Sequence, residues 1–130
     1  MITTKDVREF VETISDAEHY YIGMLSNKPD KAIGIYNLKG SGSQPRAIGS
    51  ESTYAIKDIS ILIHWNKNAD ETERAALSLY EQLRTVKNVI INAHTVYMIE
   101  LLTLEPVDVG TDEKGVYERV IELRLYYERK

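Results

Sequence analysis

The fold is decided by residues 106–130, which read PVDVGTDEKGVYERVIELRLYYERK. The first part, up to Gly115, is rich in Gly and Asp, residue types that favour turns. From Val116 to Glu128 apolar and polar side chains largely alternate, and this period of two predicts a long β-strand. Because an unpaired strand edge attracts other chains, this strand must pair within the domain or with a neighbour.

Two long strands are expected. In the last strand, one face is expected to be solvated. The opposite face carries Tyr117, Arg119, Ile121, Leu123, Leu125 and Tyr127. A second strand is predicted over residues 53–65. One of its faces carries Ala55, Ile59, Ile61, Ile63 and Trp65, interrupted by Lys57. Apolar residues on both faces of its second half indicate a central strand that is covered, at least in part, on both sides.

Two amphipathic helices are predicted from capping residues and apolar periodicity. The first begins after Thr3 or Thr4 and has Asp6 in its first turn. The second follows Asn68, with Glu71 at the position of a capping box. The apolar stripes are Val7, Phe10, Val11 and Ile14 in the first helix, and Ala75, Ala76, Leu79, Tyr80 and Leu83 in the second.

Shorter strands complete the pattern. They are predicted over residues 19–25, 31–39, 89–91 and 95–104, whereas residues 107–115 are predicted to form a turn region. If residues 27–30 form a four-residue loop, Gly23 lies opposite Gly34 and Tyr21 lies opposite Tyr36.

The predicted order of elements is α-β-β-β-α-(β)-β-β. Runs of strands divided by one helix are typical of the α+β class. We therefore expect a single domain over residues 1–130, with a mostly antiparallel β-sheet and the two helices packed on one face.

Composition excludes several classes of protein. The chain has 130 residues, no Cys and a net charge of −4. Without Cys there is no disulfide framework, thiolate metal site or thiol nucleophile. The acidic balance argues against a nucleic-acid-binding protein, which usually carries a basic footprint. No apolar run approaches the ~20 residues that span a bilayer, so no membrane contact is expected.

Candidate residues for chemistry are few. None of the three His has a short metal-ligand spacing to another. His64 shares its predicted strand face with Asp58 and Ser60, so the alternative to a structural protein is a small enzyme or ligand-binding module with a polar site around His64. Asp108 and Asp112 superficially resemble part of a calcium loop, but their spacing predicts turns instead. No catalytic residue, cofactor or metal is expected.

Three segments of the chain occur in an informative order. The first covers residues 28–36 and runs into 40–42, the second is the strand and helix of 59–84, and the third covers 106–127. Together they resemble the phage minor capsid and tail terminator family. In that family a Pro-Asp-x-Ala-Ile strand, a strand with an amphipathic helix, and a final Gly-x-Asp-x-x-Gly-x-Tyr/Phe strand follow one another. The resemblance covers the chain from about Tyr20 onward.

The resemblance implies a structural virion protein without enzyme activity. Such a protein closes the head-proximal end of the tail tube as a homohexameric ring and then joins the head connector. Its expected partners are copies of itself, tail-tube proteins and head-connector proteins, with no membrane and no sequence-specific nucleic acid. It is expected in the virion and, during assembly, in the cytoplasm of the bacterial host.

Residues 40–50 form the longest stretch without periodicity. Two early Gly residues and a Pro argue against a regular element there, and we expect a flexible loop that a neighbouring chain orders. The subunit-interface residues predicted in it are Gly40, Ser41, Gly42, Pro45, Arg46 and Ile48.

Overall fold

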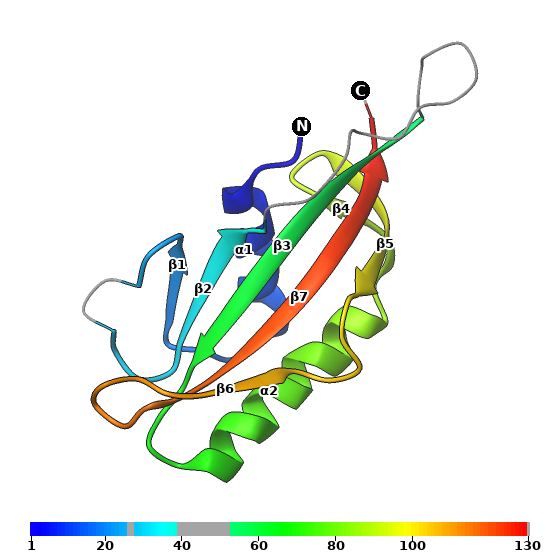
Figure 1. The fold of residues 1–130 in the computed structure, drawn as a ribbon. Helices are drawn as coiled ribbons and strands as arrows, with labels where there is room; N and C mark the ends of the chain where they lie inside the picture. The colour runs from blue at the N-terminus through cyan, green and yellow to red at the C-terminus, as the bar shows by residue number, and fades with distance from the viewer. Residues whose placement is uncertain (26–27, 39–52, 130) are drawn as a thin grey trace.

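A computed structural model describes residues 1–25, 28–38 and 53–129, and in these it shows two helices and one mixed sheet (Figure 1). The elements are α1 (Thr4–Ile14), β1 (His19–Ile22), β2 (Ala32–Asn37), β3 (Tyr54–His64), α2 (Ala69–Arg84), β4 (Lys87–Ile91), β5 (His94–Leu101), β6 (Val107–Thr111) and β7 (Tyr117–Glu128). The strand order is β1-β2-β3-β7-β5-β4, with β6 also paired to β7. The predicted α+β class is confirmed.

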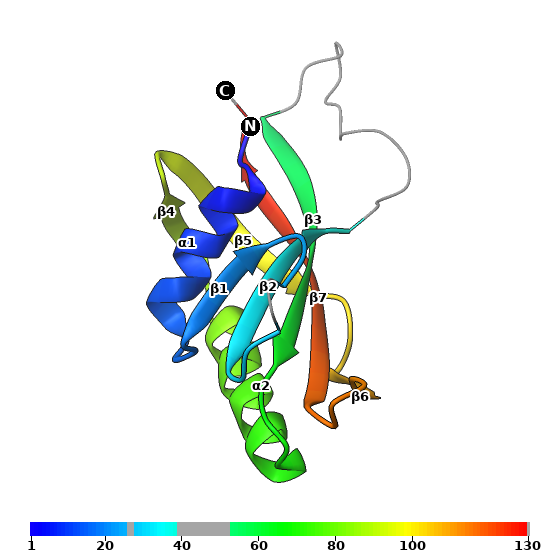
Figure 2. The same cartoon turned by 90° about the vertical axis from the view of Figure 1, so that its left-hand side faces the viewer.

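Strand β7 organises the sheet. It pairs with β3 along one side, from Glu128 opposite Tyr54 to Glu118 opposite His64. Along its other side it pairs first with β6 and then with β5. Figure 2 shows α1 and α2 on the same face of the sheet. The molecule therefore has two layers, a helical layer and a sheet, and we call the helix-covered face the inner face.

The core lies between the helices and the inner face. The core faces predicted for β3 and β7 are confirmed, because Ile59, Ile61 and Ile121 are all 0% exposed. The helices cover them with Val7, Val11, Ala76, Leu79 and Leu83. Lys57 interrupts this face as predicted. Its partial burial lowers the pKa of its ammonium group, and the charge of Asp6 opposes that shift.

Both predicted helix starts are present. Thr3 caps α1 by accepting a hydrogen bond from the Asp6 N–H at 3.2 Å, and the Asp6 carboxylate accepts from the Thr3 N–H at 2.9 Å. Asn68 caps α2 by accepting from the Glu71 N–H at 3.0 Å. The Glu71 carboxylate accepts from the Asn66 amide at 2.6 Å. The bonds that Thr3 and Asn68 accept satisfy N–H groups that the first turn of each helix leaves without partners. In α2 the Asn68 N–H donates to the Asn66 side chain and not to Glu71, so the capping box is not completed there.

The predicted pairing of the first two strands is wrong. Strands β1 and β2 are parallel, and Tyr21 lies opposite Gly34, not Tyr36. Gly23 lies beyond the end of β1 with a φ of 76°, and its N–H donates to the Ile35 oxygen. Because β1 and β2 run in the same direction, a tight hairpin turn cannot connect them, since such a turn joins antiparallel strands only.

Gly34 provides space in this arrangement. A Cβ atom at this position would lie 3.1 Å from a Leu25 methyl carbon and 3.0 Å from the Tyr36 ring. Leu25, which follows β1, is buried. Thus the absence of a side chain at Gly34 lets Leu25 and Tyr36 cover the sheet at this point.

Strand β6 is the element that sequence reasoning missed. Residues 107–115 were expected to be a turn region, yet Val107–Thr111 pairs antiparallel with β7. All five residues of β6 are exposed, so they carry no inward apolar period. The pairing also shifts register between Asp108 and Thr111, around Gly110 with its φ of 85°. Because β6 is exposed and contains a bulge at Gly110, its residues resemble those of a turn, and the sequence pattern therefore predicted a turn.

The predicted turn between β4 and β5 is confirmed. Asn92 and Ala93 form its centre with φ values of 46° and 69°, as in the two-residue loops that suit the twist of a hairpin. The Asn92 amide donates to Asp6 at 2.9 Å and to Glu9 at 2.7 Å, both in α1. The hairpin is thereby attached to the first helix.

The core should depend on Ile121 far more than on an exposed isoleucine. Ile121 is 0% exposed, and Ile121→Ala is expected to lower the free energy of unfolding by about 2–5 kcal/mol, because it leaves a cavity. Ile90 is 74% exposed, and Ile90→Ala, the matched control, is expected to change it by less than about 0.5 kcal/mol. Urea titration followed by circular dichroism measures both. Equal losses would contradict the assignment of this core.

The attachment of α1 to the β4–β5 turn should make stability depend on acid. The Asn92 hydrogen bond is the main cause of the lowered pKa of Asp6. Asp6 therefore contributes stability above its ordinary pKa of 3.8, and this contribution is lost as the pH falls through the lower folded-state value. We expect Asp6→Asn to lose less stability than the wild type between about pH 5 and about pH 2. Urea midpoints at each pH test this, and equal slopes for the two proteins would contradict it.

Candidate functional site

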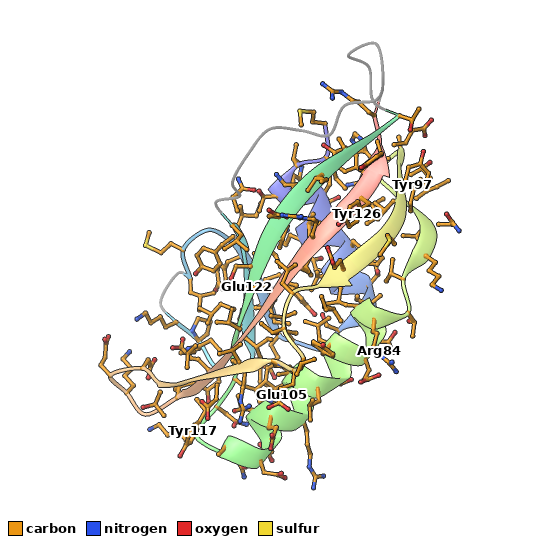
Figure 3. All side chains as sticks on the ribbon, turned by 45° about the vertical axis from the view of Figure 1, so that its right-hand side comes forward. Arg84, Tyr97, Glu105, Tyr117, Glu122 and Tyr126 are labelled. Carbon is orange, nitrogen blue, oxygen red and sulfur yellow. The ribbon has the colours of Figure 1, made fainter. Side chains whose placement is uncertain are left out.

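The outer face of the sheet carries a polar network across β3, β7 and β5. Arg124 donates from Nε and Nη2 to the two carboxylate oxygens of Asp58, at 2.7 and 3.2 Å. The Tyr126 hydroxyl donates to Glu100 at 2.8 Å, and this bond is the main cause of the raised pKa of Tyr126. Figure 3 labels Tyr126 and Glu122 on β7. The network joins three neighbouring strands through side chains on the face that the helices do not cover.

A second polar cluster surrounds His64 at the end of β3. The His64 side chain is 0% exposed. Its Nδ1 lies 2.9 Å from Oε2 of Glu118, and its Nε2 lies 3.2 Å from the backbone oxygen of Lys28. A carbonyl oxygen only accepts, so Nε2 donates to Lys28. The hydrogen bond between Nδ1 and Glu118 gives the second ring nitrogen a partner as well.

Asp112 completes this cluster from the turn between β6 and β7. Its Oδ1 accepts from the N–H groups of Val116 and Lys114, at 3.0 and 2.9 Å. The bond from Val116 is the largest cause of the lowered pKa of Asp112. Its Oδ2 is buried without a hydrogen bond and lies 3.7 Å from Nε2 of His64. The turn chemistry predicted for Asp112 is confirmed.

The predicted grouping of His64 with Asp58 and Ser60 is wrong. His64 contacts Glu118, Lys28 and Asp112, whereas Asp58 pairs with Arg124. A shared strand face does not bring these side chains together, because six residues of strand separate His64 from Asp58 by about 20 Å. The real neighbours come from the strand alongside and from two loops, and strand register decides them.

The three His residues lie apart. His19 is exposed and stacks on Tyr21 with ring centroids 6.4 Å apart. His94 lies 3.8 Å from Asp6 and makes an edge contact with Tyr127. In the described part of the chain, no three His, Asp or Glu side chains are grouped so that they could hold a metal ion. The cluster around His64 instead ties the end of β3 to the β1–β2 connection and the β6–β7 turn.

Exposed apolar side chains are frequent in one stretch of the chain. Among the described residues, seven of the twelve exposed large hydrophobic side chains belong to the segment from β4 to β6. They are Ile90, Tyr97, Met98, Leu102, Leu104, Val107 and Val109. Strands β4 and β6 each pair with one neighbour only within the described residues, so each has a free edge. Free edges and exposed apolar groups are typical of protein–protein contact surfaces.

Sequence reasoning placed the interaction surface elsewhere. The residues predicted for it, in the stretch 40–50, lie outside the described residues and remain a prediction. The exposed segment between β5 and β6 was missed because Leu102 and Leu104 were assigned to a strand. Pro106, which cannot donate to a strand ladder, was used to end the predicted strand at Leu104, whereas β5 ends earlier, at Leu101.

The fold and these surfaces define a small α+β domain with free sheet edges. The chain matches the family described as bacteriophage tail terminator protein over residues 2–129. It therefore belongs to the bacteriophage tail terminator family, and its role is that of a structural component of the phage tail. No curated protein matches the chain. Neither described helix is long and apolar enough to cross a membrane.

The cluster at His64 should be required for stability. His64→Ala removes the hydrogen-bond partner of the Glu118 carboxyl group and of the Lys28 carbonyl, and we expect it to lower the free energy of unfolding by about 2 kcal/mol or more. His19→Ala, at an exposed position of β1, is the matched control and should change it by less than about 0.5 kcal/mol. Urea unfolding of both variants measures the difference. If His64→Ala were as stable as the wild type, the cluster would not tie these segments together.

Proposed function

We propose that this chain closes the head-proximal end of the phage tail tube as a ring of identical subunits and then joins the head connector. Six copies per ring are what the family resemblance implies. Assembly takes place in the cytoplasm of the bacterial host, and the finished ring stays in the virion. The partners are copies of the chain, the tail-tube protein and the head connector. The protein acts by contact and carries out no chemical reaction.

The observation that carries this proposal is the family match over residues 2–129, together with the exposed apolar segment from β4 to β6. Leu104 is 98% exposed, and it is one of seven exposed large hydrophobic side chains in this segment of the described residues. In a closed ring every subunit covers such groups on its neighbour, and the free strand edges are protected in the same way.

The alternative function, a ligand site at His64, has less in its favour. The imidazole is 0% exposed, and both of its nitrogens already have hydrogen-bond partners in the same chain. A ligand would have to displace Glu118 or Lys28 before it reached the ring. The cluster is therefore better explained as a structural tie.

Tube assembly tests the proposal. Purified tail-tube protein of the same phage is allowed to polymerise with and without this chain, and electron microscopy records tube lengths and ends. We expect capped tubes of limited length with the chain, and longer tubes without a cap in its absence. Light scattering of the chain, alone and with the tube protein, reports the ring. Unchanged tube lengths and no added density at tube ends would refute the proposal.

A further inference from the structure

The exposed side chain of Leu104 lies on the segment beside one flank of helix α2, and a groove lies beside the other flank. We propose that Leu104 of one subunit inserts into the groove beside α2 of the next copy, so that the subunits join head to tail. This inference rests on the proposed function and adds the surfaces that meet. Because the two surfaces differ, repeated contacts of this kind generate a ring where the rotation closes.

Leu104 is presented on a segment that is held in place. It is 98% exposed and lies between β5 and β6. The residue before it is attached to α2, because the Tyr80 hydroxyl donates to the Thr103 oxygen at 2.6 Å. The Thr103 hydroxyl donates to the Glu105 oxygen at 2.7 Å, and Pro106 is buried. An apolar side chain held on a fixed segment loses little conformational freedom when it binds.

The groove lies between the end of α1, α2 and the inner face of β2 and β3. Its volume is about 260 Å³. It is lined by Ser15, Asp16, Ile33, Ile63, Trp65, Arg74, Ala75, Ser78 and Leu79. A cavity of roughly 150 Å³ already holds benzene, so this groove can admit a leucine side chain. It is smaller than the ~300–1,000 Å³ of typical small-molecule sites.

The leucine and the groove lie on opposite flanks of α2. At 3.6 residues per turn, Ala75 and Ser78 project to one side of the helix, and Tyr80, which holds the β5–β6 segment, projects toward the other. Figure 3 shows Glu105 on this segment, beside α2. A neighbour that uses one flank therefore leaves the other flank free for the next copy.

The charges beside the two surfaces are complementary. Glu105, next to Leu104, is exposed. Arg74 lines the groove, and its side chain is 79% exposed. Arg74 pairs within the chain with Asp70 at 2.9 Å, and an ion pair this exposed is cheaply exchanged for another. The groove is also lined by Asp16, just after the end of α1. A second copy docked with Glu105 on the Arg74 side of the rim places opposite charges together and keeps Glu105 away from Asp16, which favours that copy as the occupant.

Cysteine crosslinking tests the contact, because the native chain contains no Cys. Leu104→Cys and Ser78→Cys chains are mixed in equal amounts under oxidising conditions, alone and with the tube protein. We expect a disulfide-linked dimer from the mixture and none from either variant alone. A mixture of Met24→Cys with Ser78→Cys is the control, because Met24 is 83% exposed but lies after β1. That control mixture should remain uncrosslinked.

A second variant measures the contact without a crosslink. Leu104→Asp is expected to keep the wild-type melting curve and to weaken self-association at least tenfold, because a buried carboxylate would replace the leucine. Met24→Asp should leave association unchanged. Light scattering over a concentration series gives both results.

The outcomes separate this inference from the proposed function. Rings without the expected crosslink, or Leu104→Cys chains that crosslink to each other, would overturn the inference and leave the proposed function intact. The expected crosslink with unchanged tube lengths would support the contact and refute the tube-closing function. A chain that stays monomeric at every concentration, with and without tube protein, would overturn both.

Discussion

The pairing of β3 with β7 determines the rest of this molecule. Its register places Ile61 opposite Ile121, and both side chains then point to the inner face. A slip by one residue would turn every apolar side chain of one strand toward solvent. Polar contacts on the outer face fix the same register. Arg124 binds Asp58 opposite it, and His64 binds Glu118 at the end of the ladder.

The pairing of β3 with β7 also gives the inner and outer faces of the sheet different functions. The inner face is covered by both helices and holds the core, so it gives stability (Figure 2). The outer face carries charged and aromatic side chains that are satisfied by one another across strands. Contact with other molecules is then left to the free edges, to the segment between β5 and β6, and to the groove beside α2.

A structural role in a phage tail is consistent with this division. The polar cluster around His64 closes one end of the sheet by tying β3 to two loops, and it leaves the imidazole without access to solvent. In contrast, Leu104 is almost fully exposed on a segment that hydrogen bonds hold against α2. Stability and contact are thus assigned to different parts of the chain, as expected for a subunit that must be folded before it assembles.

Local patterns in the chain were enough for most of the elements. The Thr3 and Asn68 caps, the alternation of β3 and β7, and the Asn92 turn act over a few residues, so the sequence specifies them without knowledge of the fold. The α+β class followed from their order.

Three features required contacts between distant parts of the chain. Parallel pairing of β1 depends on where the chain crosses back, and the exposed strand β6 exists only because β7 offers it an edge. The neighbours of His64 come from residues 28, 112 and 118, which strand register and loop path bring together. Periodicity records which way a side chain points, but it does not record which strand lies alongside, and that is why these features appear only in the folded molecule.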